Sequence, residues 1–215
     1  NGTMVQVAVT DLSAYFDDEI TAMPNLVTVG AGGTASTVAG IPFFSADNSI
    51  YTHDVSGTDD TAQHNAAYGI GAMDAITTGD QNSALGYNAL SANNTGAQNT
   101  AMGRLSLEAN TSGDNNTAYG SSTLSANSTA DDNTAIGKGS MQSNTTGAAN
   151  TAVGKDSLKA NTTGTRNLAI GYQAYTASDT ENDNLAIGYQ AMVTNTAGGQ
   201  YNIAIGNYAA DALTS

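Results

Sequence analysis

The side chains in this sequence that could bind a metal or move a proton are two histidines and a few neighbouring carboxylates. His53 and His64 lie eleven positions apart, and one histidine per chain could hold a metal on the symmetry axis of an oligomer. Carboxylate oxygens are ligands that Ca²⁺ prefers. The adjacent acids are Asp17, Asp18, Glu19, Asp59 and Asp60. We expect the histidines at surface or turn positions and the acids in solvated turns, so no metal site and no cofactor is predicted.

The net charge of the chain limits the classes of molecule that it is expected to bind. The chain has 19 acidic and five basic residues, for a formal net charge of −14. Nucleic-acid binding needs cations that neutralise phosphates, and an anionic membrane attracts polybasic patches. No apolar run approaches the ~20 residues of a membrane span. We therefore expect neither nucleic acid nor membrane insertion. The basic residues are Arg104, Lys138, Lys155, Lys159 and Arg166.

Asparagine recurs at a nearly constant interval through the C-terminal two-thirds of the chain. The spacing between neighbouring members is 17 in seven successive intervals and 18 in the last. A fixed period of this kind is typical of solenoids and other repeat architectures. The recurring asparagines are Asn65, Asn82, Asn99, Asn116, Asn133, Asn150, Asn167, Asn184 and Asn202.

Other columns of the repeat are equally regular when each unit is numbered from its asparagine as position 0. Position 2 is Ala and position 4 is Gly in all nine units, position 3 is apolar or Tyr, and position 8 is bulky in eight units. These residues are predicted to be structural. The set selected for this role is Asn82, Ala84, Gly86, Asn99, Ala101, Gly103, Asn133, Ala135, Gly137, Asn150, Ala152, Gly154, Asn167, Ala169, Gly171, Asn184, Ala186 and Gly188.

The composition of each unit favours strands over helices. An Asn, Thr and Gly cluster in each unit breaks helices and favours turns. The remainder accommodates two short strands, at positions 0–3 and about 6–9, with the Gly at position 4 at the corner between them. Positions 0–4, 7 and 8 carry no charge in any unit, so these columns are expected to face a dry interior.

The sequence therefore predicts an all-β fold. Residues 65–215 form a β-solenoid, or β-roll, of nine ~17-residue coils, and residues 1–64 form a small irregular N-terminal module. With strands about 4.8 Å apart, nine coils would make a rod roughly 43 Å long.

The asparagines of the repeat allow two interpretations. Their amides could stack as a ladder that bonds from coil to coil and to turn backbone. Alternatively, N-x-S/T triplets such as those beginning at Asn110, Asn127 and Asn161 could be glycosylated. We favour the ladder, because the triplets recur wherever the turn recurs.

The expected interior is thin for a single chain. Two large apolar side chains and one Ala per coil bury little area against an ordering cost of about 1–2 kcal/mol per residue. We therefore expect a homotrimer, intertwined or side by side, with the strand of positions 2 and 3 near a common axis. A monomeric solenoid with a capped core is the alternative.

Three runs carry a family resemblance. Asn133–Gly137 (NTAIG), Asn150–Gly154 (NTAVG) and Asn167–Gly171 (NLAIG) resemble the S-V-A-I-G strand of trimeric autotransporter adhesin heads. Longer units such as NTAVGKDSLKANTTGT resemble repeats of bacteriophage tail-fibre and virion-fibre proteins. The resemblance implies a homotrimeric β-roll, a shaft or host-attachment role, and an extracellular location on the virion. Its partners would be copies of itself, other virion fibre or baseplate proteins, and a host cell-surface glycan.

Residues 1–64 lack the period. Met4–Thr10 alternates as a short strand, and residues 30–40 have a loop or linker composition. Asp11 could cap a short helix that Pro24 ends, with a strand or extended segment as the alternative. The segment PNLVTVG resembles joints between modules of phage fibres. We expect this module to cover the open edge of the first coil.

No catalytic pattern accompanies the repeat. Glycoside hydrolysis needs two facing carboxyl groups about 5–10 Å apart, but no two adjacent units repeat an acid at positions 5–9. A nucleophile elbow, a phosphate-binding loop and a dinucleotide fingerprint are also missing. The expectation is a structural phage fibre segment and not an enzyme. The alternatives are a bacterial trimeric surface adhesin, a monomeric ice- or glycan-binding solenoid, and a polysaccharide-cleaving spike.

Overall fold

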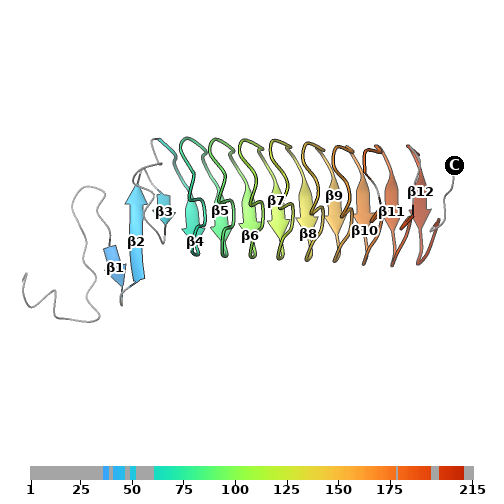
Figure 1. Cartoon of the computed structure of the whole chain (residues 1–215), viewed down its shortest axis with the longest axis horizontal. Helices are drawn as coiled ribbons and strands as arrows, with labels where there is room; N and C mark the ends of the chain where they lie inside the picture. The colour runs from blue at the N-terminus through green and yellow to red at the C-terminus, as the bar shows by residue number, and fades with distance from the viewer. Residues whose placement is uncertain are drawn as a thin grey trace, which may run out of the picture.

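In a computed structural model, the chain forms an all-β parallel solenoid (Figure 1). The structure describes the backbone of residues 36–38, 41–46 and 49–51, and residues 61–177, 179–194 and 199–210 in full. These residues contain no helix. The strand expected at Met4–Thr10 and the helix expected after Asp11 lie outside the described residues.

One three-residue strand per coil builds the solenoid. Neighbouring strands are parallel and paired in register, so that Ala135 lies opposite Ala118 on one side and Ala152 on the other. This register confirms the predicted coil and its length. The strands are β4 (Ala66–Tyr68), β5 (Ser83–Leu85), β6 (Thr100–Met102), β7 (Thr117–Tyr119), β8 (Thr134–Ile136), β9 (Thr151–Val153), β10 (Leu168–Ile170), β11 (Leu185–Ile187) and β12 (Ile203–Ile205).

Three further strands extend the sheet at its N-terminal end. β1 (Ser36–Val38) and β2 (Ile41–Ala46) are antiparallel, as are β2 and β3 (Ser49–Tyr51). β3 then pairs in parallel with β4, so the first coil of the solenoid has a paired edge. The expectation of a loop or linker over residues 30–40 was wrong for β1, whose last two residues are β-branched and pair with β2.

The second strand predicted at positions 6–9 does not form. These positions are turns, because the backbone has positive φ at positions 6 and 8, as at Leu105 (57°) and Leu107 (50°). The N–H groups at positions 6 and 8 bond to opposite neighbouring coils: Leu105 donates to the carbonyl of Tyr87 at 2.9 Å, and Leu107 donates to that of Thr123 at 3.0 Å. Coil-to-coil bonding therefore continues through this segment without strand geometry.

The interior contains fewer large apolar side chains than the sequence predicted. Side chains alternate across a strand, so the Ala at position 2 points inward and positions 1 and 3 point outward. The prediction that position 3 contributes a second large apolar side chain to the interior was wrong. Eight of the nine coils bury a large side chain at position 8, and the first coil also buries Ile76. The large side chains at position 8 are Met73, Leu90, Leu107, Leu124, Met141, Leu158, Tyr175 and Met192.

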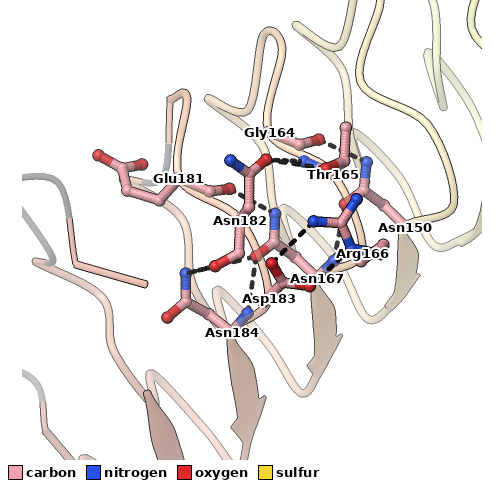
Figure 2. Close-up of polar contacts among 9 residues, drawn as sticks. All are labelled: Asn150, Gly164, Thr165, Arg166, Asn167, Glu181, Asn182, Asp183 and Asn184. Carbon is pink, nitrogen blue, oxygen red and sulfur yellow. Dashed lines mark hydrogen bonds and ion pairs between the residues drawn. The ribbon is translucent and has the colours of Figure 1, made fainter. Parts of the chain in front are cut away.

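Buried asparagines fill the rest of the interior as the predicted ladder. At position 0, Oδ1 of each asparagine accepts the backbone N–H of the next, as from Asn167 to Asn150 at 2.9 Å and from Asn184 to Asn167 at 3.0 Å (Figure 2). The amide nitrogen of Asn150 also donates to the carbonyl of Gly164 at 2.8 Å. The ladder therefore supports turn backbone as well as linking coils.

A second ladder runs at position 11. The amide of Asn144 donates to Oδ1 of Asn127 at 3.0 Å and to the carbonyl of Gly147 at 2.9 Å, and the same pattern recurs in neighbouring coils. Asn110, Asn127 and Asn161 are completely buried and their amide nitrogens are donors in this ladder. Glycosylation of these asparagines is therefore incompatible with the folded chain.

The glycine at position 4 fits a corner where neighbouring coils touch. Gly154 has a φ of +135°, and a Cβ there would lie 2.3 Å from the carbonyl oxygen of Gly171 in the next coil. A side chain would thus clash with the backbone of the next coil, which explains the Gly of every unit that has a coil after it.

Candidate functional site

The outward side of the parallel sheet is the surface with the most distinctive chemistry. We call it the strand face and define it as the side chains at positions 1 and 3 of strands β4 to β12. The side chains at these positions carry no charge in any unit. The strand face therefore runs along the whole stack of coils as an uncharged strip.

Large apolar side chains at position 3 are exposed along the strand face. Tyr119 is 58% exposed, Ile136 40% and Ile205 66%. The full column is Tyr68, Leu85, Met102, Tyr119, Ile136, Val153, Ile170, Ile187 and Ile205, each of which is exposed or half-buried. Exposed apolar strips of this kind are characteristic of interaction surfaces in proteins generally, which makes the strand face the candidate site.

Position 1 changes in character along the solenoid. It is Thr in β6 to β9, then Leu168, Leu185 and Ile203, and these side chains also point outward. An ice-binding face would need regular outward Thr residues. The outward Thr row exists in the middle coils, but aliphatic residues replace it in the last three.

Tyrosines border the strand face at its C-terminal end. The rings of Tyr172 and Tyr189 stack with centroids 5.3 Å apart, and Tyr208 meets Tyr189 edge-on at 5.3 Å. Partial burial in this row raises the pKa of Tyr189 above its ordinary value. Because each ring contacts the ring of the next coil, the row extends the aromatic surface from coil to coil.

The two borders of the strand face differ in charge. The border after the strand, at position 5, holds Arg104, Lys138 and Lys155 and no acid. The border before the strand, at positions 15 and 16, is mainly acidic. Its charged residues are Asp80, Asp114, Asp131, Asp132, Arg166 and Asp183, and Arg166 pairs with Asp183 at 2.6 Å (Figure 2).

The residues selected from the sequence as structural lie together inside the coils or at their corners. Asn133 and Ala135 are completely buried, and Gly137 stands at the corner that follows β8. The same arrangement holds for the corresponding residues of the other selected units. They form the scaffold behind the strand face and do not form part of it.

The residues considered for metal chemistry do not form a site in the described part of the chain. His64 is exposed at position 16, whereas His53, Asp17, Asp18, Glu19, Asp59 and Asp60 lie outside the described residues. No cluster of three or more His, Asp or Glu side chains within metal-binding reach occurs in the part that is described. Across those same residues, no helix has the length and hydropathy needed to span a membrane.

No protein-family model, curated protein or solved structure matches the chain. A function is therefore inferred from the fold and from the chemistry of the surfaces.

Sequence reasoning missed the outward orientation of position 3. Strand alternation could have revealed it. Successive side chains of a strand point to opposite faces, so an Ala that points inward at position 2 leaves positions 1 and 3 pointing outward. The second ladder was also missed. Its signal was the Asn that recurs at position 11 in Asn93, Asn110, Asn127, Asn144 and Asn161.

Proposed function

We propose that this chain is the shaft of a homotrimeric fibre in which the strand faces of three parallel copies pack together around a common axis. The observation that carries this proposal is the exposure of the apolar column at position 3. The coil closes its own interior through positions 2, 7 and 8 and the two asparagine ladders. The apolar residues outside that interior are therefore available to a second copy.

The repeat that keeps charged residues off the strand face also stacks its coils into an elongated rod. Nine coils stacked about 4.8 Å apart give a repeat region roughly 43 Å long. Each coil contacts only its neighbours, so reach grows with the number of coils. This geometry suits a spacer that holds other domains away from a surface.

The resemblance of the units to phage fibre repeats supports a place on the virion, where the rod would supply reach for host attachment. A trimeric adhesin on a bacterial surface would use the same packing and is the alternative. The proposal assigns the chain no catalytic step, cofactor or nucleic-acid partner. Other virion proteins at either end of the rod and a host glycan would be its remaining partners.

Electron microscopy of the isolated chain tests the proposal. We expect short rods whose end views have three-fold symmetry. The variant Ile170→Asp/Ile187→Asp places charges on the strand face without touching the interior, and it should give only thin single-chain rods. Thr146→Asp/Thr163→Asp, on the exposed turn at position 13, is the matched control and should keep the three-fold views. Single-chain rods for the unchanged protein would contradict the proposal.

A further inference from the structure

The charges that border the strand face are separated by sign. At position 5 the charged residues are all basic, and the single base at positions 15 and 16, Arg166, pairs with Asp183 of the next coil. The acids left on that border are Asp80, Asp114, Asp131 and Asp132. Each strand face therefore has a basic border on one side and an acidic border on the other.

The coil that contains β8 has both signs at one level. Asp131 and Asp132 precede the strand Thr134–Ile136, and Lys138 follows it directly after Gly137. Lys138, Asp131 and Asp132 are all exposed. One level of the rod thus has a cation and two carboxylates on opposite borders of the strand face.

Within the described part of the chain, Lys138 and Asp132 have no ion-pair partner, since no group of opposite charge lies within 4.0 Å of either. Three other bases of the array are paired within the chain. Lys155 and Lys159 contact Asp156 at 3.5 and 3.2 Å, and Arg166 contacts Asp183. Lys138 and Asp132 also cannot reach each other within one coil, because the strand between them alone spans about 10 Å.

Symmetry determines which borders can meet. If the copies are related by rotation about an axis parallel to the rod, the same coil of every copy lies at the same level. The border after the strand in one copy then meets the border before the strand in the next copy, which is a heterologous contact. The basic border of one copy then faces the acidic border of the next. In an antiparallel pair with strand faces together, each border would meet its own kind.

We infer that the copies of this chain associate in parallel through an ion-pair seam in which Lys138 of one copy contacts Asp131 and Asp132 of the next. This inference rests on the proposed fibre and adds the orientation and register of its chains. The apolar strand face supplies the area of the contact, and the seam allows only the parallel arrangement with coils level.

Cysteine cross-linking tests the seam, because the chain has no cysteine of its own. The positions tolerate the change: position 5 is Ser in Ser121, and position 16 is Ala in Ala149. After oxidation, Lys138→Cys/Asp132→Cys should give covalent trimers and nothing larger, since a closed ring has no free end. Each single variant should stay one chain on a denaturing gel. Lys138→Cys/Thr146→Cys, with the second thiol on the turn at position 13, should also remain uncross-linked.

A charge exchange gives a second readout that does not depend on disulfide geometry. Lys138→Asp alone should weaken the trimer at least tenfold, because it places acids on both borders at one level. Lys138→Asp/Asp132→Lys should recover most of that loss. Far-ultraviolet circular dichroism of each variant checks that the fold is intact.

The outcomes separate the two proposals. Native trimers that do not cross-link through positions 132 and 138 and do not respond to the charge exchange would overturn the seam and leave the fibre standing. Covalent dimers from Lys138→Cys alone would show like borders meeting, and would overturn the parallel arrangement. A monomeric chain would overturn both.

Discussion

Oδ1 of Asn133 accepts the backbone N–H of Asn150 at 3.0 Å, while the amide nitrogen of Asn133 donates to the carbonyl of Gly147 at 2.9 Å. One buried side chain thus satisfies the main chain of two neighbouring segments. The carbonyl of Gly147 has a second donor in the amide of Asn144, whereas Asn133 is the partner of the buried N–H of Asn150, so losing that bond leaves an unpaired polar group in the interior.

Replacement of this side chain should be costly. We expect Asn133→Ala to lower the free energy of unfolding by about 2–4 kcal/mol, because a buried donor or acceptor left unpaired costs about 1–3 kcal/mol. Thermal unfolding followed by circular dichroism measures the effect. Thr146→Ala on the exposed turn should change stability by less than about 0.5 kcal/mol. Equal effects for the two variants would contradict the ladder's role.

A methyl group at the glycine corner should be tolerated even less. In Gly154→Ala, the Cβ would lie 2.3 Å from the carbonyl oxygen of Gly171, at a φ of +135° that L residues rarely adopt. We expect the free energy of unfolding to fall by at least about 3 kcal/mol, or the chain to fail to fold, as measured by denaturant unfolding.

The substitution Ala149→Gly should have the opposite effect. Ala149 has a φ of +57°, so Gly there should stabilise the chain by up to about 1 kcal/mol.

Whole coils should be removable. Deletion of residues 99–132 takes out two units and joins Gln98 to Asn133, which restores the normal sequence of positions. Since each coil contacts only its neighbours, the product should fold and be shorter by about 10 Å. Small-angle X-ray scattering measures this length. Deletion of residues 116–149 should give the same shortening, and loss of folding in both would argue against independent coils.

The Arg166–Asp183 pair should make stability depend on pH and salt. Hydrogen bonds from Arg166, at 2.6 and 2.8 Å, hold the pKa of Asp183 below its ordinary value. The pair therefore stabilises the fold above the ordinary carboxyl pKa of about 3.9, and the contribution is lost as the pH falls through the lowered pKa. Asp183→Asn should have a lower Tm than the parent at pH 7.

The difference between Asp183→Asn and its parent should shrink as the pH falls below the ordinary carboxyl pKa of about 3.9, and also in about 1 M salt, where charges are screened within about 3 Å. Arg166→Gln removes the same pair from the other side and should behave alike. A difference in Tm that is constant from pH 2 to pH 7 would show that the pair does not contribute through its charges.

The period and the dry columns made most of this fold predictable. The asparagines at position 0 and the glycines at position 4 sufficed to predict parallel coils of one repeat each, because few other folds repeat both at one interval. The absence of the second strand was not predictable from the side-chain pattern, since the turn that replaces it depends on positive φ at residues such as Leu107 and Leu124. Nothing in a Leu side chain indicates that conformation, which depends on hydrogen bonds to both neighbouring coils.

The sequence predicted that the strand face is uncharged, but not that it is exposed. Charge exclusion at positions 0–4 identified the strand as dry, but this pattern does not distinguish a buried interior from an uncharged outer face. Ile136 and Met141 are both large, apolar and uncharged, yet one is 40% exposed and the other is fully buried. Ile136 points outward because it alternates with the buried Ala135 in β8, whereas Met141 lies in the turn with a φ of 48°, a conformation that its side chain does not indicate.

The solution mass of the unchanged chain, measured by multi-angle light scattering, tests the central claim that strand faces pack against one another. The account predicts a particle with three times the mass of one chain, which is 21.6 kDa. A mass of 21.6 kDa that stays constant as the protein concentration rises would show that the strand face remains open to water, and would contradict the account.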